Sequence, residues 1–297
     1  MSKANTLTVG LVQQACSEDQ AANLAAGAAG VREAAARGAK LVLLPELHGH
    51  RYFCQTEDPA CFDLAEPVPG PTTEALAGLA RELGVVIVAT VFEQRAEGLY
   101  HNTAVVLERD GTLAGRYRKM HIPDDPGYHE KYYFTPGDQG FRPVTTSVGR
   151  LGVLICWDQW FPEAARLMAL AGARLLLYPG AIGWDPGDTG EEQARQLDSW
   201  ITVQRAHAVA NALPVLSCNR TGHEADPAGA GPGIDFWGNS FIAGAQGEIV
   251  VRAGAREPEI VVATLDLGRT ERVRRIWPFL RDRRIDAYAD LGRRFRK

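Results

Sequence analysis

Short apolar runs of strand length alternate with helical segments along this chain, and that alternation constrains the fold more than any other feature. Residues 40–44 (KLVLL), 85–92 and 151–156 are such runs, and a nearly continuous apolar run is typical of a strand buried on both faces. The Ala-rich segment 20–37 and the segment 72–83 are predicted helices, each followed by a glycine, a common stop signal. Alternating strands and helices predict an α/β fold.

Turn signals between other apolar runs predict hairpins, so the sheet is expected to be mixed. Asp110-Gly111 and Gly247-Glu248 are such signals, each next to strand-like sequence. The Gly- and Pro-rich stretch 226–233 is short and is interpreted as a surface loop, so no linker divides the chain. We therefore predict one domain, residues 1–267, followed by a C-terminal arm, residues 268–297.

The predicted arm is basic and also apolar. Residues 269–297 hold 11 Lys or Arg against 4 Asp or Glu, whereas the whole chain has a net charge of −4. A basic segment can bind nucleic acid, but Trp277, Phe279 and Leu280 favour packing. We therefore expect no nucleic-acid partner. The arm is expected to pack on a neighbouring subunit of a homo-oligomer, with a dimer as the minimum.

Composition excludes several classes of protein. A content of 45% hydrophobic and 23% charged residues is near the globular average and argues against disorder. No run of about 18 apolar residues predicts a membrane span, and residues 1–12 lack the features of a signal peptide. Five widely spaced cysteines without a Cys-x-x-Cys pair favour a reduced protein. We expect a cytoplasmic protein with no membrane partner.

Three residues of complementary chemistry follow predicted strands. Glu46, Lys119 and Cys156 each stand where an apolar run ends, and functional sites of α/β proteins gather at strand ends. Each residue alone is usually a loop carboxylate, a surface cation or a small packing residue. Together they offer a base for the thiol proton, a cation for an oxyanion, and a nucleophile. The backbone N–H of Trp157 is a candidate second oxyanion donor.

A metal-dependent hydrolase is the main alternative from the residues themselves. His48 and His50 form a His-x-His at a strand end, and other histidines stand at positions 101, 121 and 129. Gly49 weakens strand pairing there, and no partner motif with ligand spacing follows. We therefore expect neither a metal nor another cofactor.

The motifs carry a resemblance to a known family. Residues 43–46 (LLPE), 118–121 (RKMH) and 156–158 (CWD) resemble the three signature segments of the nitrilase superfamily of carbon–nitrogen hydrolases. The resemblance implies an α/β fold of the nitrilase-like type, an α-β-β-α four-layer sandwich with mixed sheets. It spans nearly the whole chain.

The resemblance also implies the catalytic residues. It places a Glu–Lys–Cys triad on Glu46, Lys119 and Cys156, with the cysteine as nucleophile. A second family glutamate, which helps to position the lysine and the substrate, falls on Glu130. Such an enzyme needs no cofactor.

Further segments narrow the expected substrate. Similarity to one branch of the family extends over residues 52–55, 119–128, 130–131, 134–138, 155–163 and 238–244. It implies hydrolysis of N-carbamoylputrescine to putrescine, carbon dioxide and ammonia, a step from agmatine to polyamines. N-carbamoyl-β-alanine or an aliphatic amide remains an alternative substrate, and a non-catalytic protein of the same fold is a further alternative.

The expected substrate carries an ammonium group at its far end. Carboxylates and aromatic faces bind such a cation, whereas a substrate with a carboxylate tail needs an arginine. The predicted substrate-binding residues are Trp157, Asp125, His129, Trp160, Asp185 and Tyr52. Residues 48–51 (HGHR) and 181–188 (AIGWDPGD) depart from the family pattern and leave the substrate preference open.

Overall fold

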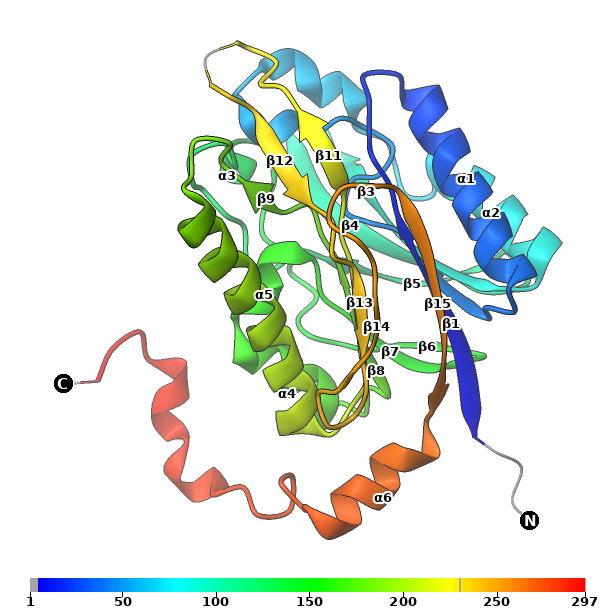
Figure 1. Ribbon diagram of the computed structural model, residues 1–297, viewed down its shortest axis with the longest axis vertical. Coiled ribbons are helices and arrows are strands. Elements are labelled where there is room, and N and C mark those ends of the chain that lie inside the picture. Colours follow the sequence, from blue (N-terminus) through cyan, green and yellow to red (C-terminus); the bar gives the residue numbers. More distant parts are fainter. Residues whose placement is uncertain (1–4, 230, 297) are drawn as a thin grey trace.

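Two six-stranded sheets form the centre of the protein. The computed structural model describes residues 5–229 and 231–296. The first sheet has the strand order β15-β1-β2-β3-β4-β5, and the second has the order β14-β13-β10-β8-β7-β6. Helices α1 and α2 cover the first sheet, and α4 and α5 cover the second (Figure 1). This arrangement is the α-β-β-α sandwich that the family resemblance predicts.

The elements have the following bounds. The first sheet comprises β1 (Thr6–Gln13), β2 (Leu41–Leu43), β3 (Val86–Ala96), β4 (Leu99–Leu107), β5 (Leu113–Arg118) and β15 (Glu259–Asp266). The second comprises β6 (Val144–Thr146), β7 (Gly149–Val153), β8 (Leu175–Pro179), β10 (Val215–Cys218), β13 (Phe241–Ala243) and β14 (Ile249–Arg252). A small third sheet comprises β11 (Thr221–Glu224), β12 (Ile234–Trp237) and β9 (Gly183–Trp184). The helices are α1 (Gln20–Ala36), α2 (Pro71–Leu83), α3 (Glu130–Tyr133), α4 (Pro162–Leu170), α5 (Gly190–Asn211) and α6 (Gly268–Ile276).

Strand pairing is mixed in both sheets. β1, β2 and β3 are parallel, whereas β4, β5 and β15 pair antiparallel with their neighbours. In the second sheet β7, β8 and β10 are parallel, and β6, β13 and β14 add antiparallel. The predicted hairpins occur at Asp110-Gly111, between β4 and β5, and at Gly247-Glu248, between β13 and β14.

The continuous apolar runs fill two cores at once. In β2, Leu41 and Leu43 join the core between the two sheets, whereas Val42 and the following Leu44 join the core under α1 and α2. Successive side chains of a strand point to opposite faces, so a strand buried on both faces must be apolar throughout. This two-sided burial explains why residues 40–44 do not alternate with polar residues.

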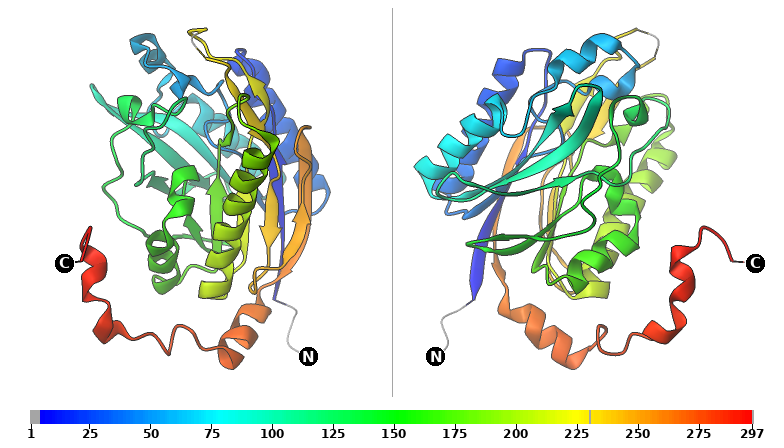
Figure 2. Two further views of the ribbon diagram at one scale, coloured as in Figure 1. Left: turned by 60° about the vertical axis from the view of Figure 1, so that its left-hand side comes forward. Right: turned by 180° about the vertical axis from the view of Figure 1, so that it is seen from behind.

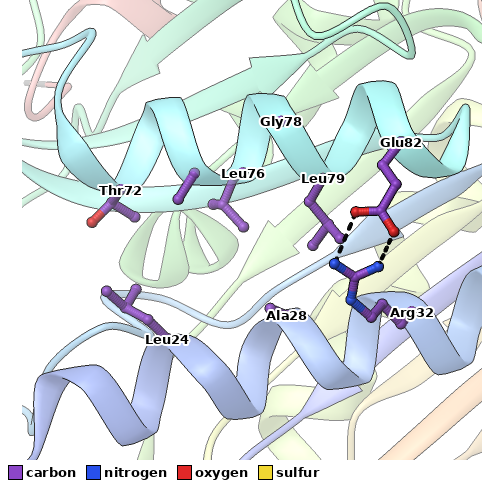
Figure 3. Close-up of a pocket in the computed structure, with 9 residues that line it drawn as sticks. Leu24, Ala28, Arg32, Thr72, Leu76, Gly78, Leu79 and Glu82 are labelled. Carbon is purple, nitrogen blue, oxygen red and sulfur yellow. Dashed lines mark hydrogen bonds and ion pairs between the residues drawn. The ribbon is translucent and has the colours of Figure 1, made fainter.

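Helix α1 lies close to the first sheet and beside α2. A Cβ atom on Gly30 would lie 2.5 Å from Cγ1 of Val12, so glycine permits the close approach of the helix. A small pocket between the two helices is lined by apolar side chains such as Leu24 and Leu79. Arg32 of α1 and Glu82 of α2 form an ion pair at its edge (Figure 3).

The predicted strand 151–156 is wrong at its end. β7 ends at Val153, and Cys156 begins a 3-10 helix, Cys156–Trp160. The N–H of Leu154 still bonds to the carbonyl of Leu177 in β8, but the chain then turns away from the sheet. The predicted loop 226–233 lies between β11 and β12, which pair antiparallel. No helix within the described residues has the length and apolar content needed to cross a membrane.

The C-terminal arm runs outside the sandwich. Helix α6 follows β15 and leads into two short 3-10 turns at the red end of the chain (Figures 1 and 2). Trp277 and Phe279 stack on each other with ring centroids 6.1 Å apart, yet both remain about half exposed. Ile276, Ile285 and Phe295 are more exposed still.

We predict that Glu93→Gln lowers the free energy of unfolding by about 3 kcal/mol at neutral pH. Glu93 of β3 is buried and bonds to Arg118 at 2.7 Å and to Arg116 at 3.0 Å. The variant leaves the buried Arg118 with Asp138, at 3.4 Å and half-exposed, as its remaining anion. Burial alone would raise the pKa of Glu93. The bonds from Arg118 and Thr103 and the nearby positive charges outweigh burial, so the pKa lies below its usual value.

The effect of this variant should depend on pH. Because the folded pKa is depressed, the stabilisation is present above the unfolded pKa and disappears as the pH falls through the folded pKa. Urea unfolding should therefore show a smaller difference between the two proteins at about pH 3 than at pH 7. Glu82→Gln, which removes an exposed ion pair, is the control and should leave unfolding unchanged. An equal loss at both pH values would contradict the prediction.

Candidate active site

Lys119 lies between two carboxylates in the interior. Its Nζ donates to Oε1 of Glu46 at 2.7 Å and to Oε2 of Glu130 at 2.6 Å, and all three side chains are buried. Glu46 follows β2, Lys119 follows β5, and Glu130 begins α3. The structure thus brings together three residues that are predicted from separate segments of the sequence.

Burial and the paired charges set the ionisation of this group. Burial lowers the pKa of Lys119, but the charges of Glu130 and Glu46 raise it more, so the lysine remains an ammonium at neutral pH. Burial raises the pKa of Glu130 to about 7, against the opposing effect of Lys119 and with a further increase from Glu46. Glu130 is therefore protonated more readily than an exposed glutamate.

Cys156 joins the same buried group at the start of the 3-10 helix. Burial and then the charge of Glu46 raise the pKa of its thiol well above the usual value, and Lys119 only partly opposes them. The thiol is therefore protonated at neutral pH, and a nucleophilic reaction requires a base beside it. Its Sγ lies 3.9 Å from the carbonyl oxygen of Ala181, which follows β8.

Oε2 of Glu46 can serve as that base. Oε1 of Glu46 accepts from Lys119 and from Nδ2 of Asn102, both at 2.7 Å. Oε2 is buried and has no hydrogen-bond partner within the described part of the chain. One oxygen of the carboxylate is therefore occupied and the other is free to accept a proton.

Asp158 holds the turn that carries Cys156. Cys156 has a φ of +41°, a strained conformation for a residue other than glycine. Oδ2 of Asp158 accepts from the N–H of Ile155 at 2.9 Å and from the hydroxyl of Tyr117 at 2.8 Å. Its Oδ1 accepts from the N–H of His121 at 3.1 Å and lies 2.7 Å from Nδ1 of the same residue. The carboxylate thus joins the turn of Cys156 to the segment of Lys119.

Arg220 holds the segment that carries Glu46. Its Nε donates to the carbonyl of Glu46 at 3.0 Å, and its Nη2 donates to that of Leu47 at 2.5 Å. Leu47 has a φ of +49°, so these bonds stabilise a strained backbone. Arg220 is fully buried, and Glu224 balances its charge at 2.8 Å. The sequence analysis missed Arg220, Glu224 and Asn102, and it included Asp158 only as part of the segment 156–158 (CWD).

A cavity of about 1210 Å³ opens above Cys156 and Glu130. Five predicted substrate-binding residues line it: Trp157, Asp125, His129, Trp160 and Asp185. The structure places the sixth, Tyr52, elsewhere: it is fully buried and donates its hydroxyl to Glu130 at 2.7 Å. Tyr52 therefore contacts the buried charges and does not line the cavity.

The lining of the cavity is strongly acidic. Six carboxylates besides Glu130 contribute to it: Asp124, Asp125, Asp185, Asp188, Glu192 and Asp226. Arg195 is its lone guanidinium among the described residues, and it is paired with Glu191 and Glu192. Such a lining attracts cations and repels anions.

The histidines of the metal alternative do not form a ligand set. No group of three or more His, Cys, Asp or Glu side chains able to hold a metal occurs within residues 5–229 and 231–296. Burial and the charge of Arg220 lower the pKa of His48 to about 3 and that of His50 to about 4. Nδ1 of His101 lies 2.8 Å from the carbonyl oxygen of Thr135, so this histidine is bonded to the backbone.

Comparison with known proteins agrees with this geometry. The carbon–nitrogen hydrolase family model matches residues 8–275. An N-carbamoylputrescine amidase of Solanum lycopersicum is 46% identical over 98% of this chain and 97% of its own length. A citrullinase of Francisella tularensis is 39% identical over 97% of this chain and 99% of its own length.

A solved structure gives the same result. The crystal structure of a carbon–nitrogen hydrolase from Helicobacter pylori G27 superimposes with a TM-score of 0.95 at 51% identity, covering 98% of this chain and 100% of that chain. The match of the family model over most of the chain, together with these relatives, confirms the predicted family. The chain belongs to the nitrilase superfamily and is a carbon–nitrogen hydrolase similar to the N-carbamoylputrescine amidases.

Proposed function

We propose that this enzyme hydrolyses N-carbamoylputrescine to putrescine, carbon dioxide and ammonia. The acidic lining of the cavity above Cys156 carries the proposal, because this substrate has an ammonium group at the end remote from the ureido carbon. The similarity to N-carbamoylputrescine amidases over nearly the full length supports the same substrate.

The charges of the cavity favour this substrate over its competitors. N-carbamoyl-β-alanine carries a carboxylate alone, and citrulline carries a carboxylate beside its α-ammonium. A free arginine would bind either carboxylate. Arg195 is already paired with two glutamates and lies among further carboxylates. Asp125 and Asp185 are the groups assigned to the ammonium, with the aromatic faces of Trp157 and Trp160 beside them.

The reaction begins at the thiol of Cys156. Oε2 of Glu46 takes the thiol proton while Sγ attacks the ureido carbonyl, and Lys119 with the N–H of Trp157 stabilises the oxyanion. The C–N bond to the terminal nitrogen then breaks, and Glu46 returns the proton to the leaving ammonia. Sγ remains bonded to the carbamoyl carbon.

Water completes the reaction. Glu46 takes a proton from the water that attacks the carbamoyl carbon, and the C–S bond breaks to regenerate Cys156. The released carbamate loses carbon dioxide and gives putrescine. Glu130 holds Lys119 in place through both steps.

We predict that Cys156→Ser lowers kcat by about 1,000-fold or more, because a hydroxyl is far less acidic than a thiol and Glu46 is too weak a base to ionise it. Ammonia release from N-carbamoylputrescine measures the loss. Cys218→Ser is the matched control, since Cys218 is also fully buried but bonds to the carbonyl of Val12, outside the cavity. Activity of Cys156→Ser near that of the control would exclude the thiol as nucleophile.

We predict that Asp185→Asn or Asp125→Asn lowers kcat/KM for N-carbamoylputrescine about tenfold, because the ammonium loses one charged partner. Turnover of a neutral aliphatic amide should not change. Asp138→Asn is the control, since Asp138 is paired with Arg95 and does not line the cavity. Preference of the unaltered enzyme for citrulline or N-carbamoyl-β-alanine would contradict the proposed substrate.

We further propose that the arm packs on a second copy of the chain. Its exposed apolar side chains support this assembly, since isolated apolar groups gain free energy when a neighbouring subunit covers them. The double substitution Trp277→Ser and Phe279→Ser should lower the molar mass measured by light scattering, and Val250→Ser, an exposed strand residue, should not. A monomeric unaltered protein would contradict this proposal.

A further inference from the structure

Two hydrogen-bond donors converge on the same oxygen of Glu46. Nδ2 of Asn102 and Nζ of Lys119 each lie 2.7 Å from Oε1, whereas Oε2 has no partner among the residues that the structure describes. The terminal torsion of a glutamate is broad, so the plane of the carboxylate can rotate unless its contacts hold it. The two contacts of Oε1 therefore decide where the free oxygen points.

Lys119 alone does not fix the orientation of the Glu46 carboxylate. Its ammonium rotates freely, ends a flexible stem, and also bonds to Glu130 at 2.6 Å. Asn102 has a planar amide on β4, between β3 and the edge strand β5, and it pairs with Phe92 of β3. Its backbone carbonyl also accepts from the N–H of Lys119 at 2.9 Å. One residue thus holds the side chain of Glu46 and the backbone of Lys119.

The oxygen Oδ1 of Asn102 shows that the Nδ2 donor is the functional part of this amide. Asn102 is fully buried, and its Oδ1 has no partner in the described chain. A buried acceptor without a partner destabilises the fold, whereas an apolar side chain of similar size would not. The donor of the amide therefore accounts for an asparagine at this position, and that donor contacts Oε1 of Glu46.

We propose that Asn102 is a positioning residue that holds Oε1 of Glu46, so that Oε2 stays aimed at proton transfer with Cys156. The proposal deepens the mechanism given above and rests on its assignment of Glu46 as the base. It does not depend on which amide or carbamoyl compound the enzyme hydrolyses.

Asn102→Leu tests the proposal because leucine has a similar size and no donor. We expect kcat to fall about 10- to 100-fold with little change in KM, since a misplaced base loses part of its contribution. The acid limb of the pH profile of kcat/KM should move to higher pH, because the ionised carboxylate has lost a hydrogen bond.

Alkylation of Cys156 provides a readout that needs no substrate. Chloroacetamide forms a C–S bond with the thiolate and expels chloride, and peptide mass spectrometry follows the modification of Cys156 between pH 6 and 9. In Asn102→Leu this rate should fall and its acid limb should shift in the same direction as that of kcat/KM. If Asn102→Leu shows the shift but the unaltered enzyme does not hydrolyse N-carbamoylputrescine, the proposed function fails and the role of Asn102 stands.

Asn211→Leu is the matched control. Nδ2 of Asn211 donates to the carbonyl of His207 at 2.9 Å, its Oδ1 also lacks a partner within the described residues, and it lies outside the cavity. The control should keep the alkylation rate and both pH profiles. Equal thermal destabilisation of both variants, with both profiles unchanged, would reduce Asn102 to a structural residue and overturn the proposal.

A variant closer in shape covers the case in which Asn102→Leu does not fold. Asn102→Asp keeps the shape of the side chain but places a second acidic group against Oε1 of Glu46. Its alkylation limb must also move to higher pH, since two adjacent carboxylates resist joint ionisation. An unmoved limb in Asn102→Asp would overturn the proposal as well.

Discussion

The contact of the Lys119 ammonium with two buried carboxylates is the interaction on which the rest of the site depends. Removing three charged groups from water is costly unless each is paired and hydrogen-bonded. Lys119 satisfies one oxygen of Glu46 and one of Glu130, and Tyr52 bonds to the other oxygen of Glu130. One carboxylate oxygen, Oε2 of Glu46, is left without a partner among the described residues, and it is the oxygen that the proposed mechanism uses as the base.

The two-sheet sandwich explains how these groups meet. The segment after β2 in the first sheet reaches the segment after β8 in the second, where the N–H of Glu46 donates to the carbonyl of Gly180 at 3.1 Å. Both turns at this junction contain strained residues, Leu47 and Cys156, and each is held by a buried side chain, Arg220 or Asp158. Arg220 reaches Leu47 from a segment far away in the sequence, and Asp158 joins the turn of Cys156 to Tyr117 and His121.

That distance in sequence also explains what the sequence alone could predict. Glu46, Lys119 and Cys156 follow apolar runs, and a polar residue directly after a buried strand is visible in the pattern. Asn102 lies inside β4, and strand periodicity does not reveal that its amide contacts the carboxylate of Glu46, which follows β2. Arg220 directly precedes β11 and Glu224 ends it, and this four-residue strand is too short for a periodic signal. The end of β7 was misplaced because residues 154–155 stay apolar and extended after the ladder ends.

The buried group and the acidic lining can change independently. Asp124 and Asp185 lie on exposed segments, so their replacement changes the charge of the cavity without disturbing the bonds around Lys119. The buried residues cannot be replaced in this way, because each one bonds to a charged group or holds a strained turn. Relatives with names as different as N-carbamoylputrescine amidase and citrullinase therefore fit one scheme. In that scheme the proposed C–N cleavage rests on the buried group around Lys119, and the proposed preference for an ammonium end group rests on the acidic lining.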